Sequence, residues 1–586
     1  MSNKLKTLYH EYKEKYKYYE QKNHHYIMVR SSILILFILL VIAGIKVPAI
    51  QPYFIMMLFI LFCVFLIVCI YHDKARKHKR YYQFSLDIIN EYQKRINNTW
   101  YDFDDLGEDL VDENQDFLFD LDIVGKNSLF QYLNIAKSLG GRERLINQLS
   151  NTAINKEDLY KQQQAIIELS KNLEFCIQFQ VMLREDKGIN DYLVKKVEAL
   201  DYPTVHHKVE LIINTIISII TLIIAFLALF NIVDGVYFSI MALIQLCYAL
   251  IIHGIFRQEL TIIQSSSKSF SQLYKIFQTI DRYSFSSEKM EQLMKSIKNG
   301  KEIVSALNKV YDLDTFRYHF LGYVLANSLL PLNSYILYSF HKASSTSLEA
   351  LKESIFAFEE IEALISLSTI GVCKNNICMP KFNDDILLKL KEIQHPLLKE
   401  NECIANSFEC NDDIVIITGS NMSGKTSFMR TIGTNLILMY AGTFVNAASF
   451  EAPYLKILTS MRISDDIDKG ISTFYGELLR IKKMIDCQKE NIPMIIFIDE
   501  IFKGTNYNDR IYGAKKVIEK LGNSQTILFM TTHDFELCDI DNEKIKNYYF
   551  EEYYEANKIQ FDYKIKKGKC HTTNAKYLMK QIGIID

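Results

Sequence analysis

One stretch of the sequence decides the fold class, and it reads Ile414-Val-Ile-Ile-Thr418-Gly419-Ser420-Asn421-Met422-Ser423-Gly424-Lys425-Thr426-Ser427. Its apolar beginning is typical of a buried strand, and its second half has the spacing GxxxxGK[ST]. A segment of helical character follows to Tyr440. A phosphate-binding loop requires this order of strand, loop and helix. The stretch therefore predicts an α/β P-loop ATPase domain of ABC-like type, with a parallel-rich sheet flanked by helices.

The residue types of the loop suit a nucleotide. Two glycines allow backbone N–H groups to surround phosphate oxygens, Lys425 neutralises charge on the β and γ phosphates, and the Thr426 hydroxyl ligates Mg²⁺. We therefore expect ATP and Mg²⁺ as cofactors. The expected ATP-binding residues are Gly419, Ser420, Asn421, Met422, Ser423, Gly424, Lys425, Thr426 and Ser427.

Two later strands supply the remaining groups. The run Pro493-Met-Ile-Ile-Phe-Ile-Asp499-Glu500 is an apolar strand that ends in two carboxylates. We expect Asp499 to hold Mg²⁺ through water and Glu500 to orient or deprotonate the attacking water. A helix N-cap is the bland alternative for such a pair. A further strand, from Gln525 to Thr532, ends in His533 at the same predicted sheet edge, where a γ-phosphate contact would lie.

Four apolar stretches are long enough to cross a bilayer as helices, and they form two hairpins. The first hairpin comprises 31–50 and 53–71, and the second comprises 211–233 and 236–252. Lys and Arg residues flank the first hairpin on both sides, which places the N-terminus, the helical core and the ATPase domain in the cytoplasm of a multi-pass cell-membrane protein. A cleavable signal peptide and a hairpin buried in a soluble core are the alternatives.

The remaining chain divides by composition. Residues 127–202 and 258–370 have helical periodicity with few breaks, and the acidic stretch from Asp102 to Asp122 is interpreted as a solvated linker rather than a calcium loop. The expected organisation is a basic N-terminal helix (1–30), transmembrane hairpin 1 (31–71), a basic then acidic linker (72–124), a helical core (125–205), transmembrane hairpin 2 (206–254), lever-like helices (255–385) and the ATPase domain (386–586).

Global composition limits the partners. The formal net charge is −2, so no overall basic field points to nucleic acid. The 11 cysteines follow no disulfide framework and suit a reducing compartment. The pairs Cys373/Cys378 and Cys403/Cys410 lack the spacing of common zinc sites, so no structural metal is expected.

The same motifs resemble those of the MutS mismatch-repair family. The resemblance rests on 418–430, on 464–474, on Asp499 to Asn506 and on Thr532-His533, with Gln394 to Leu398 similar to the start of the family's ATPase domain. It is strong over 390–545 and weak over about 125–370, where Gly140-Gly141-Arg142 and Gln162-Gln163 resemble the helical core. The resemblance implies a homodimer with a composite ATP site, in which Ser472 and Thr473 of one subunit close the nucleotide of the other.

The sequence also departs from the family pattern. Ser420 and Ser423 replace the usual Pro and Gly, and Phe502-Lys503 replaces Gly-Arg. We find no mismatch-reading domain and no obvious C-terminal helix-turn-helix, and the second hairpin lies near the place of the family's DNA clamp. Two functions follow: a membrane-anchored, DNA-associated ATPase of the mismatch-repair or damage-sensing type, or a membrane machine in which dimer closure acts on a lipid or protein partner without DNA.

Overall fold

The computed structural model describes residues 3–46, 51–111, 115–150, 155–185, 204–318, 320–462, 473–522, 525–555 and 558–570. The chain forms two compact units, each assembled from separate segments. The first unit contains 1–93, 172–283 and 298–353, and the second contains 94–171, 284–297 and 354–586.

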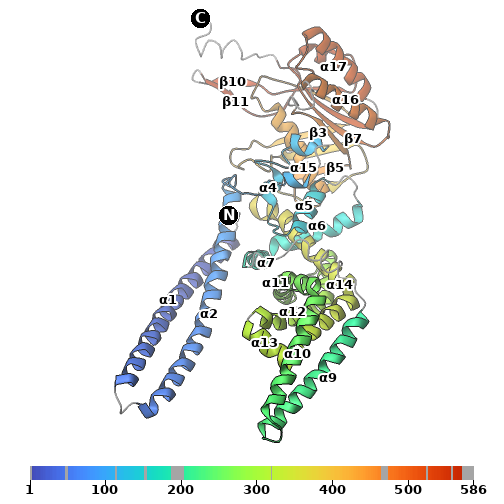
Figure 1. Ribbon diagram of the computed structural model, residues 1–586. Helices are drawn as coiled ribbons and strands as arrows, with labels where there is room; N and C mark the ends of the chain where they lie inside the picture. Colours follow the sequence, from blue (N-terminus) through green and yellow to red (C-terminus); the bar gives the residue numbers. More distant parts are fainter. Residues whose placement is uncertain are drawn as a thin grey trace. The chain divides into compact units, whose positions relative to one another are not determined.

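The first unit is helical. It is built from α1 (Asn3–Lys46), most of α2 (Gln51–Ile96), α7 (Leu173–Glu185), α9 (Thr204–Leu229), α10 (Gly235–Ile255), α11 (Arg257–Ile280), most of α12 (Glu288–Asp314), η3 (Thr315–Tyr318), α13 (Phe320–Leu329) and the first half of α14 (Leu332–Cys373). Helices α1 and α2 lie side by side, as do α9 and α10 (Figure 1). The predicted hairpins are thus pairs of adjacent helices.

Four of these helices are long and apolar enough to cross a membrane: α1, α2, α9 and α10. Their most apolar stretches are between 0% and 17% buried, so large aliphatic and aromatic side chains face outward. The connection of the second hairpin is tight because Asp234 caps α10, accepting a hydrogen bond from the Val236 N–H at 3.0 Å. The connection of the first hairpin, 47–50, lies outside the described residues.

The second unit is organised by a six-stranded sheet of order β12-β9-β4-β8-β7-β6. All neighbouring pairs are parallel except β12 and β9. Its strands are β4 (Ile414–Thr418), β6 (Lys456–Ser460), β7 (Met494–Asp499), β8 (Thr526–Thr531), β9 (Ile545–Tyr549) and β12 (Lys566–Lys567). The strands predicted at 414–418, 493–500 and 525–533 are therefore confirmed to within two residues at each end.

Both faces of this sheet are covered, which explains why its strands are apolar throughout. On one face, Ile414, Ile496 and Leu528 pack with residues of α16 (Thr473–Gln488) and α17 (Tyr507–Leu521). On the other face, Phe529 contacts Phe408 of β3, whose ring in turn packs on α15 (Lys425–Tyr440). Alternate residues along each strand serve opposite layers.

Smaller elements complete the second unit. A four-stranded sheet has the order β1-β5-β2-β3, and a two-stranded ribbon pairs β10 with β11. Their bounds are β1 (Lys381–Phe382), β2 (Leu387–Ile393), β3 (Asn406–Asn411), β5 (Ser449–Ala452), β10 (Glu552–Glu555) and β11 (Lys558–Phe561). The short helices are η2 (Glu108–Leu110), α3 (Asp116–Asp120), α4 (Leu129–Leu133), α5 (Leu139–Ser150), α6 (Lys156–Lys171) and η4 (Phe535–Asp539).

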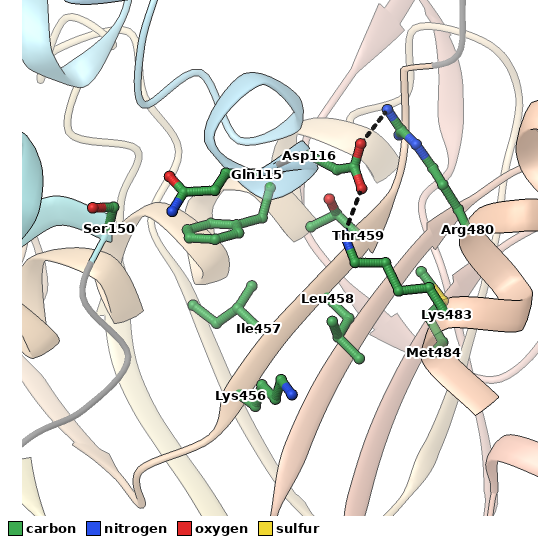
Figure 2. Close-up of a pocket in the computed structure, with 11 residues that line it drawn as sticks. Gln115, Asp116, Ser150, Lys456, Ile457, Leu458, Thr459, Arg480, Lys483 and Met484 are labelled. Atoms are coloured by element: carbon green, nitrogen blue, oxygen red, sulfur yellow. Dashed lines mark hydrogen bonds and ion pairs between the residues drawn. The ribbon is translucent and has the colours of Figure 1, made fainter. Parts of the chain in front are cut away.

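The interpretation of 102–122 as a solvated acidic linker is wrong for its C-terminal part. Asp120 is completely buried and accepts hydrogen bonds from the backbone N–H groups of Met461 and Arg462, both at 3.0 Å. Asp116 pairs with Arg480 and Lys483 of α16, each at 3.2 Å (Figure 2). Carboxylates that satisfy buried donors are held in the fold rather than in solvent, a role that local composition does not reveal.

Candidate functional site

The site lies at the carboxyl ends of three adjacent parallel strands, β8, β4 and β7. The β4 strand ends at Thr418 and passes into the loop 419–424, which leads directly into α15. The β7 strand ends at Asp499 and the β8 strand ends just before Thr532 and His533. Parallel strands bring their carboxyl ends to one edge, so residues more than a hundred positions apart meet there.

The loop between β4 and α15 depends on its glycines. Gly419 has φ +151° and Gly424 has φ +107°, values that disfavour side chains. A Cβ atom at Gly419 would lie 2.7 Å from the carbonyl oxygen of Phe550, so the backbone leaves no space there. Met422, with φ +67°, is 84% exposed at the tip of the loop. The loop is thus a close-packed turn that leads directly into the first residues of α15.

Lys425 folds its side chain back over the loop. Its Nζ donates hydrogen bonds to the carbonyl oxygens of Gly419 at 2.8 Å and Ser420 at 2.9 Å. Burial lowers the pKa of this amine, while the nearby carboxylates of Glu500 and Asp499 act in the opposite direction. The ammonium group is therefore positioned at the inner side of the loop, where it can meet an anion.

Asp499 connects the loop to the neighbouring strands. The Thr426 hydroxyl donates to its carboxylate at 2.9 Å, and the Thr531 hydroxyl donates to it at 2.6 Å. Thr531 also accepts the backbone N–H of Glu500 at 3.0 Å. Thr426 and Asp499 thus present two oxygen groups side by side, which is a donor set for a hard divalent cation.

Glu500 is held by two cationic or hydrogen-bonding side chains. Its Oε1 lies 3.2 Å from Nε2 of His533, and its Oε2 lies 2.8 Å from Nζ of Lys503. The hydrogen bond from His533, supported by Lys503, lowers the pKa of this carboxyl to about 2. Its backbone has φ +50°, an uncommon conformation for a residue with a side chain. The side chain is therefore a fixed carboxylate at neutral pH.

His533 links the carboxylate to the loop. The same Nε2 that faces Glu500 lies 2.9 Å from Oδ1 of Asn421. The imidazole is partly exposed, so a ligand above the loop can reach it. Asn421 belongs to the β4–α15 loop, Glu500 follows the end of β7 and His533 follows the end of β8. A movement of the loop would therefore change the position of His533 and, through it, of the Glu500 carboxylate.

Two cavities adjoin the site, one beside Asp499 and Glu500 and one beside the end of the loop at Gly424. One has a volume of about 210 Å³ and is lined by Thr473, Glu477, Asp499, Glu500 and Lys503, among others. A larger one, of about 470 Å³, lies beside the start of α15 and is lined in part by Gly424, Ser427, Phe428, Phe550 and Tyr563. The first cavity is acidic, and the second combines rings with polar groups, as a nucleoside would require.

The structure brings most of the predicted site residues together. Lys425, Thr426, Asp499, Glu500 and His533 meet at one sheet edge, with Asn421 beside them. Ser427 lines the larger cavity. Thr473 is the first residue of α16 and lines the acidic cavity of its own chain, whereas Ser472 lies outside the described residues.

Sequence reasoning missed three groups that contact this site. Thr531 hydrogen-bonds to Asp499, Lys503 pairs with Glu500, and the Glu552 carboxylate accepts the Ser420 hydroxyl. Lys503 lies only three residues after Glu500, so its proximity was available from the sequence. Glu552 lies 132 positions from Ser420 and is brought near by the β9 strand, for which no local pattern gives a signal.

Sequence comparisons with known proteins match the part of the chain that contains this site. The family model "MutS domain V" matches residues 415–583, which contain the loop, both carboxylates and His533. The C-terminal region is thus similar to the MutS family. The DNA mismatch repair protein MutS of Thermus aquaticus is 29% identical over 222 residues, which is 38% of this chain and 27% of that protein. The MutS of Staphylococcus carnosus strain TM300 is 32% identical over 230 residues, covering 38% and 26%.

The similarity to MutS is confined to part of each protein. This chain spans about a quarter of the length of the curated relatives it matches. The match to MutS domain V supports the predicted resemblance, and the matched residues include the sheet edge described above. The apolar helices of the first unit lie outside 415–583.

Proposed function

We propose that this chain is a membrane-anchored ATP hydrolase of the MutS type whose ATPase cycle responds to DNA. The observation that carries the proposal is the convergence of Lys425, Thr426, Asp499, Glu500 and His533 at the carboxyl edge of one parallel sheet. These groups supply a cation for phosphates, an oxygen donor pair for a metal ion and a fixed carboxylate, which together are the components of phosphoryl transfer to water.

The residues present fit ATP. The loop is closely packed at Gly419, where an added Cβ atom would lie 2.7 Å from the Phe550 carbonyl oxygen, and the Lys425 ammonium lies inside the turn. Backbone N–H groups at a helix N-terminus and a buried ammonium favour phosphate oxygens. The cavity beside Gly424 and Tyr563 has space for a nucleoside at the outer side of the loop.

The residues also fit Mg²⁺. The Thr426 hydroxyl and the Asp499 carboxylate lie within 2.9 Å of each other, and hydroxyl and carboxylate oxygens are the ligands that Mg²⁺ prefers. When bound, Mg²⁺ would neutralise charge on the phosphate oxygens. Thr531 would keep the Asp499 carboxylate oriented through its own hydrogen bond.

Glu500 is the residue we assign to the attacking water. It is ionised at neutral pH, and contacts on both oxygens restrict its side chain. A carboxylate of such low basicity orients water well and removes its proton weakly. His533 holds the carboxylate and also contacts Asn421 of the loop. We propose that His533 lies near the γ-phosphate, so that nucleotide binding changes its contact with Glu500.

The proposal includes a homodimer and a membrane anchor. We propose that Ser472 and Thr473 complete the site of the partner subunit, an expectation from the MutS resemblance. The four apolar helices, with outward-facing aliphatic side chains, support two membrane hairpins. The relatives named DNA mismatch repair proteins support DNA as the partner, whereas the apolar helices favour a second candidate: a membrane machine acting on lipid or protein.

The test is the ATPase rate of the full chain in nanodiscs, measured with and without duplex DNA across a salt series. Lys425→Ala serves as the blank, because it removes the phosphate-binding cation. Stimulation by DNA that declines steeply with salt supports the proposal, since phosphate contacts release counterions. An ATPase rate that is unchanged by DNA and varies with lipid composition supports the membrane machine instead. Hydrolysis no faster than that of Lys425→Ala contradicts both candidates.

A further inference from the structure

Three ionisable side chains meet in the interior of the first unit, far along the sequence from the ATP site. They are His207 in the first turn of α9, Glu259 in the first turn of α11 and His341 in α14. Their side chains are 1%, 5% and 2% exposed, respectively. Three potential ligand atoms, one from each residue, all lie within 4.8 Å of one another.

The distances suit a shared cation. The Glu259 Oε2 lies 2.8 Å from Nε2 of His341 and 3.4 Å from Nε2 of His207. In a tetrahedral zinc site with bonds of about 2.0–2.1 Å, neighbouring ligand atoms lie roughly 3.4 Å apart. The two imidazoles are stacked, with centroids 4.2 Å apart and 9° between the rings. Binding one ion therefore requires one ring to rotate.

His207 is the ring that can make this rotation. Its Nδ1 is buried and has no hydrogen-bond partner, so no second bond fixes the ring plane. One wall of its surroundings is the ring of Phe256, whose centroid is 4.9 Å away. A buried polar nitrogen without a partner costs free energy. The hydrogen bonds within this cluster therefore do not satisfy all of its buried polar atoms.

The charge balance points the same way. Glu259 brings a carboxylate into the interior, and the ion-pair partners described for it are the two histidines, with no Lys or Arg among the described residues paired to it. A buried carboxylate needs compensating positive charge as well as hydrogen bonds. A divalent cation supplies that charge, and two imidazoles with one carboxylate are a donor set that suits zinc and similar ions.

We propose that His207, Glu259 and His341 form a binding site for a divalent transition-metal ion of the zinc class. The ion would join the start of α9 and the start of α11 to α14, and thus tie the base of the second apolar hairpin to the helix that continues into the second unit. The expectation of no structural metal rested on sequence spacing, and these ligands, 52 and 82 positions apart, show no spacing signal.

The experiment uses the full chain in nanodiscs, free of affinity tag and of nucleotide. The protein is stripped with chelator, loaded with Zn²⁺ or Co²⁺ and freed of excess ion, and the metal content per chain is measured. We expect one ion per chain in the wild type. Glu259→Gln and His341→Ala should weaken binding by more than about 100-fold, because loss of outer partners alone costs roughly 10–100-fold. His206→Ala, at the exposed neighbouring position, should bind as the wild type does.

The Co²⁺ spectrum separates this site from the thiols. A site of two imidazoles and a carboxylate gives visible ligand-field bands without thiolate charge transfer, whereas ions held by any of the 11 cysteines show it. Glu259→Gln is nearly isosteric, and its thermal unfolding without metal checks that it folds. A wild type that retains no ion, or equal retention by the wild type and the two ligand variants, overturns the proposal.

Discussion

Replacing Glu500 by Gln tests the chemistry assigned to the sheet edge. The substitution keeps the size of the side chain and its contact with His533, but removes the charge that faces Lys503. Because Gly419, Lys425 and Thr426 are untouched, we expect ATP to bind with an affinity within about threefold of the wild type. Hydrolysis should fall because the water loses its carboxylate.

The magnitude follows from the basicity of the carboxyl. General bases contribute about 10²–10⁴-fold, and the largest effects come from groups whose pKa lies near the working pH. The pKa of Glu500 is lowered to about 2 by the hydrogen bond from His533. Such a weak base should contribute at the lower end, so we expect kcat to fall by about 100-fold, or ~2.7 kcal/mol of activation free energy.

The assay is phosphate release under single turnover, together with equilibrium binding of a fluorescent ATP analogue. Glu519→Gln is the matched control, since this exposed carboxylate of α17 pairs with Lys516 on the same helix and should leave both quantities unchanged. A Glu500→Gln variant that hydrolyses ATP at the wild-type rate would refute the assignment. A loss of ATP binding equal to the loss of turnover would refute the separation of the two roles.

Two other predictions follow from the second unit. Gly419→Ala should weaken ATP binding by roughly 5–150-fold in the fluorescence assay, because the new Cβ would lie 2.7 Å from the Phe550 carbonyl oxygen and the strained backbone costs about 1–3 kcal/mol. Burial lowers the pKa of His395 to about 3. Since an unfolded histidine takes up a proton below about pH 6.5 and the folded one does so only near pH 3, stability should decline as pH falls from 6.5, by about 2 kcal/mol at pH 5, as measured by urea unfolding.

Each of these predictions has a control. Gly235→Ala adds a Cβ with nothing within 4 Å, so ATP binding should remain at the wild-type level. His395→Gln removes the titrating group, and its loss of stability between pH 7 and pH 5 should be smaller than that of the wild type by the same ~2 kcal/mol. Equal pH dependence in both proteins, or full ATP affinity in Gly419→Ala, would contradict the reasoning.

Much of the second unit was accessible from sequence because its signals are local. The apolar strand before Gly419 and the strand before Asp499 are continuous runs, and parallel pairing then requires their ends to meet. The same rule placed His533 correctly beside the loop. The length and composition of the four apolar helices were likewise readable, since a membrane-length run needs no partner to be recognised.

The remaining features depend on contacts between distant segments. Asp120 looked like one more acidic residue of a linker, yet it satisfies backbone donors at 461 and 462. The long helical stretch expected over 127–202 is divided into α4, α5, α6 and α7 as far as residue 185, because tertiary packing interrupts the periodic pattern. The residues next to a carboxylate in sequence do not determine whether it is buried. They also do not determine where a long helical segment is interrupted.

The attachment of Asp120 to Met461 and Arg480 has a consequence for biosynthesis. Residues 94–171 emerge from the ribosome before the strands they pack against, more than 300 positions later in the chain, have been made. The second unit therefore cannot close during translation of its first segment, and its assembly must wait for the final third of the polypeptide. A nascent chain would expose the acidic segment and the apolar face around Leu121 throughout that interval, so chaperone engagement should be concentrated there rather than at the C-terminal domain.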